Sequence, residues 1–391
     1  MHEFFSKKVV LVTGAAGTVG QELVRQLLDM KTAEIRALDN NETELFFLGE
    51  RYREDHNFFT FLGDVRDSRK LEEVCHGVDI IFHAAAFKHV GLSEYNPFDA
   101  VQTNVLGVKN VIGAAMRQGV KRVLFTSSDK AVNPTSVMGT TKLIGERLIT
   151  AANVANLSSD RRFSSVRFGN IIASRGSVIP IFAEQIRRGG PVTITDPQMT
   201  RFFMTNKEAV RLVLEACVMT CGGEVFVTKM PVMRISDLAQ AMTCLLAPAY
   251  GFDPQKVPAC FIGIRSGEKL YEELLTMEEM GRALETKHMF AILPTLQNFH
   301  VKIQYSYQCR VERASLQQQY ISSQEIPMTV KEIKQYLLVN NILSDLIHED
   351  KESEGFNQQT RHLRLVNETQ VGIGPNLPEH ALERVWLGKN L

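Results

Sequence analysis

Ser128, Asp129 and Lys130 place a hydroxyl, a carboxylate and an amine side by side in the chain. They directly follow a short apolar run, residues 123–125, which has the character of a buried parallel strand. Ligands of α/β proteins bind at the carboxyl ends of such strands. Because these three groups can donate, accept and exchange protons, we expect them to form an acid–base site at the edge of a sheet.

A second pair of side chains, Met138 and Lys142, follows at a spacing of four residues. Residues four apart lie on the same face of a helix. We therefore expect a helix after Pro134 that points both side chains toward one ligand, the one that also meets Ser128–Lys130.

The elements that must position these residues alternate in type along the first half of the chain. Apolar segments typical of buried strands occur at 9–13, 35–38, 58–62, 78–84, 122–126 and 164–168. Segments with helical character lie between them, at 19–30, 42–52, 68–74 and 97–117. This alternation predicts an α/β fold, a Rossmann-type doubly wound parallel sheet with helices on both faces.

From about residue 170 the segments become shorter and richer in Gly, Pro and polar residues. We assign 1–170 to the Rossmann core and 348–391 to a C-terminal tail, partly disordered or docking on a partner subunit. The range 171–347 is assigned mainly to a smaller α+β substrate-binding lobe that interleaves with the core. Its expected pieces lie at 180–188, 207–217, 235–246 and 269–277, with a late helix at 330–347.

Three glycines, Gly14, Gly17 and Gly20, join the first strand to the first helix. Glycines allow a tight turn and let backbone N–H groups approach a pyrophosphate at the amino terminus of the helix. Asp39 follows about 20 residues later, where an acidic side chain binds the adenosine ribose, and Asp64 ends the third strand near the adenine. The set predicts a bound dinucleotide. The carboxylate of Asp39 favours NAD, because it would repel the 2′-phosphate of NADP, which stays the alternative.

The overall composition argues against several classes of function. Lys plus Arg and Asp plus Glu both number 44, so the net charge is zero, which disfavours a broad nucleic-acid or anionic-membrane surface. No apolar run approaches the roughly 18 residues of a membrane-spanning helix, and residues 1–8 lack the layout of a signal peptide. We therefore expect a cytoplasmic protein that binds neither nucleic acid nor membranes. The cysteines and His83 and His89 show no metal-ligand spacing, so no metal site is expected.

Six short motifs lie between residues 7 and 275, each present once: HAAAFKHV (83–90), SDKAVNP (128–134), RFGN (167–170), SRGSVIP (174–180), TDPQMTRF (195–202) and GIRSGEKL (263–270). Together with the glycine loop they resemble the extended short-chain dehydrogenase/reductase superfamily. Within it, the chain resembles the nucleotide-sugar 4,6-dehydratases of polysaccharide biosynthesis, which act on UDP-N-acetylglucosamine and close analogues.

The chain departs from the superfamily at one position of the usual YxxxK motif, where Met138 replaces the tyrosine. A thioether has no ionisable proton, so Met138 cannot be the base that the tyrosine is. A branch of the sugar-nucleotide dehydratases resembles this chain in having methionine there. The Asp129-Lys130 pair, in place of the Asp-Glu of enzymes that act on dTDP-glucose, is the pattern of the N-acetylglucosamine type.

The resemblance implies a reaction in which NAD takes hydride from C4 of the sugar, water is lost across C5 and C6, and hydride returns to C6. We expect Lys130 to be the base at C5 and Asp129 the acid at the C6 hydroxyl. These roles need Lys130 neutral and Asp129 protonated when each acts, and burial pushes both pKa values in those directions. Ser128 would hydrogen-bond the C4 oxygen, and Lys142 would bind the nicotinamide ribose. Lys130 and Asp129 are the candidates for taking the C4 hydroxyl proton in place of the tyrosine.

The expected cofactor contacts are Gly14, Ala16, Gly17, Thr18, Val19, Asp39, Asn40, Asp64, Val65, Ala84, Ala85, Ala86, Lys88 and Lys142. The expected substrate contacts are Lys88, Asn170, Ser177, Val178, Thr195, Arg201, Arg265 and Glu268, in which the guanidinium groups suit a pyrophosphate. The implied substrate is UDP- or GDP-linked N-acetylglucosamine, and the implied assembly is a homo-oligomer formed through helices of the cofactor domain.

Two other functions remain open from the sequence. A nucleotide-sugar 4-epimerase would share the fold and the oxidation at C4, but it would not need an acid and a base at C5 and C6. A non-catalytic NAD(P)-binding regulator would need neither Lys142 nor the Ser128–Lys130 cluster.

Overall fold

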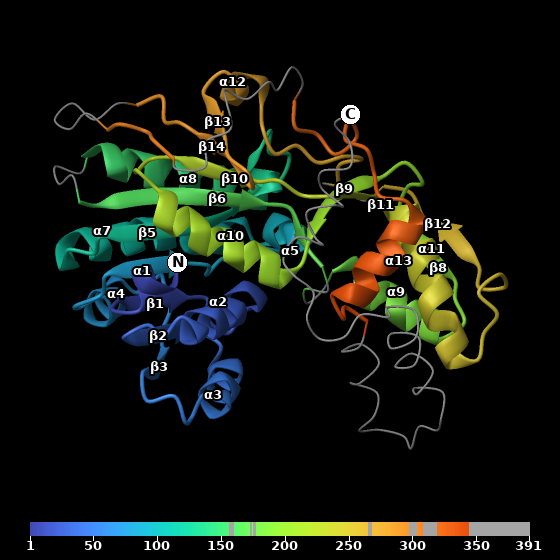
Figure 1. Cartoon of the computed structure of the whole chain (residues 1–391), viewed down its shortest axis with the longest axis horizontal. Coiled ribbons are helices and arrows are strands. Elements are labelled where there is room, and N and C mark those ends of the chain that lie inside the picture. Colours follow the sequence, from blue (N-terminus) through green and yellow to red (C-terminus); the bar gives the residue numbers. More distant parts are fainter. Residues whose placement is uncertain are drawn as a thin grey trace.

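The computed structural model describes residues 1–155, 160–172, 174, 177–264, 268–296, 303–307 and 319–343. Figure 1 shows a larger body built on one extended sheet and a smaller lobe beside it. The predicted tail, 348–391, lies outside the described residues.

The larger body contains a sheet of nine described strands in the order β13-β14-β10-β6-β5-β4-β1-β2-β3. The strands are β1 (Val9–Thr13), β2 (Glu34–Asp39), β3 (Phe58–Leu62), β4 (Ile80–His83), β5 (Arg122–Ser128), β6 (Arg162–Phe168), β10 (Val225–Thr228), β13 (Ala283–Glu285) and β14 (Met289–Ile292). The seven strands β10, β6, β5, β4, β1, β2 and β3 run parallel to one another. Strands β14 and β13 extend the β10 edge in antiparallel pairs. The predicted Rossmann-type α/β fold is confirmed, and the strand order reverses between β1 and β4, where such sheets open a ligand crevice.

Helices cover both faces of this sheet, as the strand–helix alternation predicted. One face packs α2 (Thr18–Asp29), α3 (Glu42–Arg51) and α10 (Asn206–Met219). The other face packs α4 (Ser68–Val74), α7 (Gly107–Gln118) and α8 (Val137–Ala155). Local polar side chains start several of these helices: Asn41 caps α3, Asp67 caps α4, and Thr205 forms a capping box with Glu208 at α10, as expected for helix starts.

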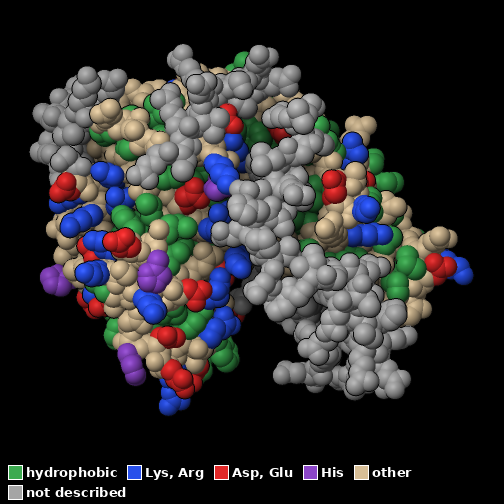
Figure 2. All heavy atoms as spheres, viewed as in Figure 1, with side chains coloured by type: hydrophobic (Ala, Val, Ile, Leu, Met, Phe, Trp, Pro, Cys, Tyr) green, Lys and Arg blue, Asp and Glu red, His purple; other side chains and the backbone are tan. Residues whose placement is uncertain are grey.

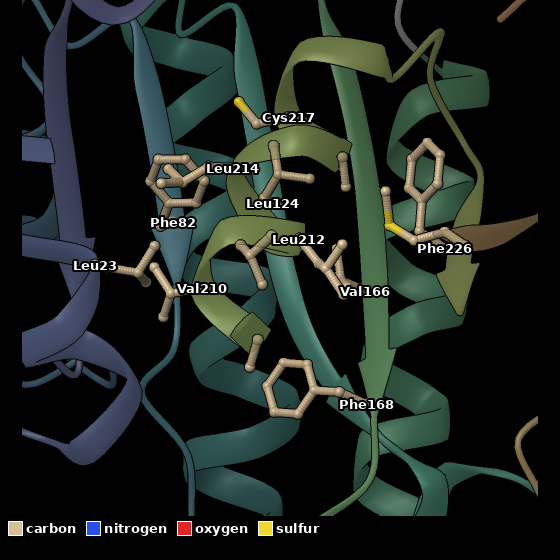
Figure 3. Close-up of a cluster of buried hydrophobic side chains, with 14 of the residues drawn as sticks. Leu23, Phe82, Leu124, Val166, Phe168, Val210, Leu212, Leu214, Cys217 and Phe226 are labelled. Atoms are coloured by element: carbon tan, nitrogen blue, oxygen red, sulfur yellow. The ribbon is translucent and has the colours of Figure 1, made fainter. Parts of the chain in front are cut away.

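The placement of α10 corrects one expectation, because its segment was predicted to belong to the smaller lobe. Leu212 and Leu214 of α10 belong to the same buried cluster as Leu124 of β5 and Val166 of β6, and Figure 3 draws Leu214 beside Phe82 of β4. The α10 helix repeats the amphipathic pattern of the core helices, but the chain reaches it only after passing through the lobe. The predicted interleaving of core and lobe therefore extends further into the core than the sequence indicated.

A second correction concerns the single helix predicted over 97–117. The structure divides it into α6 (Pro97–Val101), a π-helical turn η1 (Gln102–Leu106) and α7. The short helix α5 (Val90–Tyr95) precedes them. Turns of this wider type interrupt helices where a side chain is needed at a site, and Asn104 in η1 has such a role below.

The smaller lobe has its own apolar core, formed by α9 (Val178–Arg187), α11 (Ile235–Leu246) and α13 (Val330–Val339). Two small sheets flank it: β7 (Asn170–Ile171), β9 (Thr200–Met204) and β11 (Val232–Arg234), and β8 (Val192–Ile194) with β12 (Ala259–Phe261). The late helix predicted over 330–347 ends at Val339, and 344–347 lie outside the described residues. The remaining elements are α1 (His2–Phe5), α12 (Met277–Met280) and the 3-10 turns η2 (Asp129–Ala131) and η3 (Ala247–Tyr250).

Acidic and basic side chains are interspersed on the face of the molecule shown in Figure 2. Among the described residues, no helix combines the length and the apolar character needed to cross a bilayer.

Candidate active site

The glycine loop between β1 and α2 leaves no space for larger side chains. Gly14 has a φ of +68°, and a Cβ there would lie 2.6 Å from the backbone nitrogen of Ala85. A Cβ on Gly20 would lie 2.1 Å from the carbonyl oxygen of Gly14. Helix α2 begins at Thr18 without a side-chain cap, so its amino terminus is arranged as anion-binding helix termini are. The loop therefore fits the pyrophosphate of a dinucleotide.

Asp39 stands at the end of β2, beside this loop. Its Oδ2 accepts a hydrogen bond from the Ala16 nitrogen at 2.9 Å, and its Oδ1 accepts one from the Asn41 nitrogen at 2.9 Å. These bonds hold an anionic acceptor where a ribose hydroxyl could donate to it. Arg36 is engaged elsewhere, with Glu34 and with the carbonyl oxygens of Val74 and His76, so it does not offset the charge of Asp39.

The positions predicted around the adenosine lie on neighbouring strand ends. Asn40 Nδ2 donates to Asp64 Oδ2 at 3.1 Å, and Arg66 Nη2 lies 2.7 Å from the same oxygen. Burial alone would raise the pKa of Asp64, but the hydrogen bonds from Arg66 and Asn40 outweigh it and lower that pKa. Arg66, which the sequence did not single out, therefore lies beside the predicted adenosine pocket.

Asn104 positions the loop that follows β4 and carries Ala84–Ala86 and Lys88. Its Oδ1 accepts from the Phe87 nitrogen, while its Nδ2 donates to the Phe87 carbonyl oxygen and to Thr141 Oγ1 of α8. Asn104 is buried, and the π-helical turn η1 brings it to this place. The sequence contained no signal for this residue. Lys88 is exposed on the loop that Asn104 holds.

His83, at the end of β4, contacts Thr13 Oγ1 through Nδ1 at 2.7 Å. Burial lowers the pKa of His83 to about 3, so the ring is neutral and links the ends of β4 and β1. No group of three or more His, Cys, Asp or Glu within the described part of the chain is arranged to hold a metal ion.

Ser128, Asp129 and Lys130 lie together where β5 ends and η2 begins, as the sequence predicted. Ser128 Oγ donates to Asp129 Oδ1 at 2.7 Å, and Lys130 Nζ donates to Asp129 Oδ2 at 3.0 Å. The Asp129 side chain is 4% exposed, whereas that of Lys130 is 36% exposed. The Lys130 side chain therefore reaches solvent, whereas the carboxylate of Asp129 is enclosed.

The expected directions of the two pKa shifts in this pair are wrong. Burial opposes the charge on each group, but their mutual attraction prevails: it lowers the pKa of Asp129 and raises the pKa of Lys130. The resting pair is an ion pair, because two opposite charges at 3.0 Å stabilise each other more than separate burial destabilises them. The neutral pair contains the same number of protons, so moving one proton along this hydrogen bond produces it.

Glu272 is a third residue of the site that the sequence reasoning missed. Its Oε1 lies 3.8 Å from Lys130 Nζ and 3.2 Å from Arg201 Nε, and the side chain is 5% exposed. Asn170 Nδ2 donates to both carboxylate oxygens, and the Phe202 nitrogen donates to Oε2. Burial first, and then repulsion from Asp129, raise the pKa of Glu272 to about 7. No spacing in the sequence connects Glu272 with Lys130; the fold alone brings them together.

Two predicted substrate ligands, Asn170 and Arg201, therefore face Glu272. Arg201 also donates to the carbonyl oxygens of Thr200, Lys269 and Leu270. This set of contacts favours a bracing role for Arg201 over the pyrophosphate-binding role that we expected.

The other predicted substrate contacts are spread over the lobe. Ser177 and Val178 start α9, Thr195 follows β8, and Glu268 lies near the segment that Arg201 braces. Arg265 lies outside the described residues.

Helix α8 presents Met138 and Lys142 on one face, as predicted, and both side chains are buried. Lys142 Nζ donates to the Thr126 carbonyl oxygen at 2.9 Å and lies 4.6 Å from the centre of the Phe125 ring. Burial lowers the pKa of Lys142 to about 8. A Cβ on Gly139 would lie 2.2 Å from the carbonyl oxygen of Lys130, so the start of α8 packs directly against the turn η2 that contains Lys130.

A buried ionic triad, formed by Arg167, Glu146 and Glu279, connects the elements that surround the site. Arg167 of β6 pairs with Glu146 of α8 at 2.6 Å and with Glu279 of α12 at 2.8 Å, and it donates to the Leu274 carbonyl oxygen. Such a triad costs desolvation and specifies geometry more than it adds stability. It ties the segment that carries Glu272 to the helix that carries Lys142.

Comparison with known proteins shows the family of the chain. The family model described as polysaccharide biosynthesis protein matches residues 10–294. An uncharacterized membrane protein of Methanocaldococcus jannaschii is 50% identical over 74% of this chain and 87% of its own length. A UDP-N-acetylglucosamine 4,6-dehydratase (inverting) of Campylobacter jejuni is 37% identical over 75% of this chain and 84% of its own.

Two further similarities bear on the fold and the reaction. A UDP-glucose 4-epimerase of Rickettsia canadensis is 33% identical over 87% of this chain and 98% of its own length. The solved structure of Pen from Bacillus thuringiensis superposes with a TM-score of 0.77 and 38% identity, covering 87% of this chain and 99% of that one. The chain therefore belongs to the polysaccharide biosynthesis protein family, a nucleotide-sugar-modifying group within the extended short-chain dehydrogenase/reductase superfamily.

Proposed function

We propose that the protein is a nucleotide-sugar 4,6-dehydratase that converts UDP- or GDP-linked N-acetylglucosamine to the 4-keto-6-deoxy sugar. The observation that carries this proposal is the Asp129–Lys130 pair, held at 3.0 Å at the end of β5. An elimination across C5 and C6 needs a base and an acid close together, and this pair supplies both.

NAD is the proposed cofactor, with NADP as the alternative, and when bound it would accept hydride from C4 of the sugar and return it to C6. The glycine loop would hold its pyrophosphate, and Asp39 its adenosine ribose. The buried ammonium of Lys142, one turn along α8 from Met138, would bind the nicotinamide ribose. Its charge would also stabilise negative charge that develops on the C4 oxygen.

The residues at the end of β5 would carry the proton transfers. Once a proton has moved from Lys130 to Asp129, the neutral amine takes the proton from C5 and the carboxylic acid donates to the leaving C6 hydroxyl. The ammonium of Lys130 then returns its proton to C5. Ser128 Oγ donates to Asp129 in the resting site, so it orients the acid, and contact with the C4 oxygen would require this hydroxyl to turn.

The second candidate is a 4-epimerase, and the relative from Rickettsia canadensis with that name favours it. Proton exchange at the C4 oxygen is the main chemistry of an epimerase. Replacement of the tyrosine base by Met138 would therefore impair an epimerase more than a dehydratase. It would also leave the Asp129–Lys130 pair without a role in catalysis. These two features favour dehydration.

Exposed apolar side chains on α5 and α6, Leu92, Tyr95 and Phe98, support the proposal that copies of the chain associate through helices of the cofactor domain. Apolar groups gathered on one surface commonly mark an interface.

Purified protein incubated separately with UDP-N-acetylglucosamine and GDP-N-acetylglucosamine, without added NAD, is expected to convert one of them to a product lighter by one water. Mass spectrometry detects that loss, and it names the nucleotide. An epimer keeps the mass of the substrate, so sugar NMR distinguishes it from unreacted material. Unchanged mass with both substrates, after NAD and NADP have also been added, would contradict the dehydratase.

A further inference from the structure

Met138 leaves the site without the group that would take the C4 hydroxyl proton, and Glu272 stands next to the amine that could pass it on. We propose that Glu272 accepts, through Lys130, the proton released when the C4 hydroxyl is oxidised, and so replaces the missing tyrosine as the proton acceptor. This inference rests on the proposed dehydratase function. Glu272 acts through Lys130, so it is a positioning and proton-storing residue.

The geometry places Lys130 between two carboxylates. Its Nζ lies 3.0 Å from Asp129 Oδ2 and 3.8 Å from Glu272 Oε1. Lys130 is also the more exposed partner, at 36% against 4% and 5% for the two carboxylates. In this proposal a proton from the substrate is taken up by the amine, which lies between the two carboxylates, and a short movement of Nζ takes it to either of them.

The surroundings of Glu272 suit a group that changes charge. Three charged groups face it: Asp129 and Lys130 from η2, and Arg201 from β9. Asn170 and the Phe202 nitrogen hold the carboxylate in place in either charge state. Burial and the neighbouring Asp129 raise the pKa of Glu272 to about 7, whereas Asp129 itself is held ionised by Lys130. Of the two carboxylates, Glu272 is thus the one that exchanges a proton near neutral pH.

The protons balance around one turnover, with hydride moving separately from C4 to C6. The cycle starts once one proton of the resting ion pair has moved from Lys130 to Asp129, so that Asp129 is protonated, Lys130 is neutral and Glu272 is ionised. Oxidation at C4 breaks the O–H bond, and that proton passes over Lys130 to Glu272. Lys130 then takes the C5 proton while Asp129 protonates the leaving hydroxyl, which departs as water. Lys130 returns its proton to C5, and the proton stored on Glu272 passes over Lys130 to Asp129, which restores the starting state.

The test compares the pH dependence of dehydration in the wild type, Glu272→Gln, Glu272→Asp and Glu273→Gln. Glu272 must be ionised to accept a proton, so the wild-type kcat is expected to fall as the pH drops through about 7. Glu272→Gln is expected to lower kcat by roughly 100-fold, the lower end of what a proton-transfer group contributes, and to lose the fall near pH 7. Glu272→Asp, which keeps a carboxylate, should retain that fall at a reduced rate.

Glu273→Gln is the matched control, because Glu273 is the next residue along the chain but contacts Asn133 outside the cluster. Its rate and pH profile should equal those of the wild type. A Glu272→Gln enzyme that dehydrates with the wild-type pH profile would overturn the inference while leaving the proposed function intact.

A measurement without substrate distinguishes a failure of the Glu272 inference from a failure of the proposed dehydratase function. Infrared difference spectra of the wild type across pH 6 to 8 should show a carboxyl group that loses its proton near pH 7, and Glu272→Gln should lack this signal. If the signal is the same in both proteins, Glu272 does not titrate there and the inference is wrong. A wild type that dehydrates no nucleotide sugar would instead overturn the proposed function and, with it, the use of this proton.

Discussion

Lys130→Ala is expected to lower the rate of dehydration by roughly 1000-fold, within the range that a positioned acid or base contributes. The substitution removes the proposed base at C5, and it also removes the cation that Asp129 and Glu272 share. Two buried carboxylates would then face each other without that charge, so at least one of them would take up a proton. The rate is measured as loss of water from the nucleotide sugar under saturating substrate.

Lys256→Ala serves as the control for this experiment. Lys256 is largely exposed and pairs only loosely with Asp253, at 4.0 Å, so its removal should leave the rate unchanged. Bound dinucleotide should be present in both variants, because the ion pairs of Lys130 are with Asp129 and Glu272, whereas the proposed pyrophosphate site lies in the glycine loop. Dehydration by Lys130→Ala at near the wild-type rate would contradict the assignment of this residue as the base.

Gly20→Ala is expected to weaken dinucleotide binding by roughly 100-fold. The added Cβ would lie 2.1 Å from the Gly14 carbonyl oxygen and 2.6 Å from the Ala15 Cα, so the loop backbone must move away from the start of α2. Overpacking of this severity costs about 3 kcal/mol, and if that cost falls on the bound state it corresponds to about two powers of ten in affinity. Calorimetric titration with NAD measures the change.

Gly49→Ala in α3 provides the matched comparison, because its Cβ would meet only the Thr60 side chain at 3.5 Å, an ordinary contact. Circular dichroism of both variants shows whether the fold persists. Unchanged NAD affinity in a folded Gly20→Ala protein would mean that this loop does not hold the pyrophosphate.

The sequence predicted the core of the fold well because each core element carries its own local signal. The strand predicted at 9–13 and the helix predicted at 68–74 have the bounds that the structure shows. Helix α10 was assigned to the smaller lobe, although it packs on the large sheet. Its amphipathic pattern indicates that one face is buried, but it does not indicate which part of the fold covers that face. The π-helical turn η1 was missed, since a helix interruption that serves a buried asparagine leaves no mark on the apolar spacing.

The sequence predicted those site residues that are close together in the chain. It did not predict the residue that the fold brings in from a distant segment. Ser128, Asp129 and Lys130 meet because they are neighbours in the chain, and Met138 and Lys142 meet through one helical turn. Glu272 comes from a distant segment, so only the fold reveals it. The predicted directions of the pKa shifts of Asp129 and Lys130 were wrong for a related reason: burial was considered for each group alone, whereas their proximity to one another decides both pKa values.

The central claim, dehydration by transfer of hydride from C4 to C6 within one sugar, is tested most directly with a nucleotide sugar that carries deuterium at C4. The account predicts a product that has lost one water and carries the deuterium at C6, located by NMR. A product of unchanged mass with the deuterium still at C4, as an epimerase would give, or no reaction at all, would contradict it.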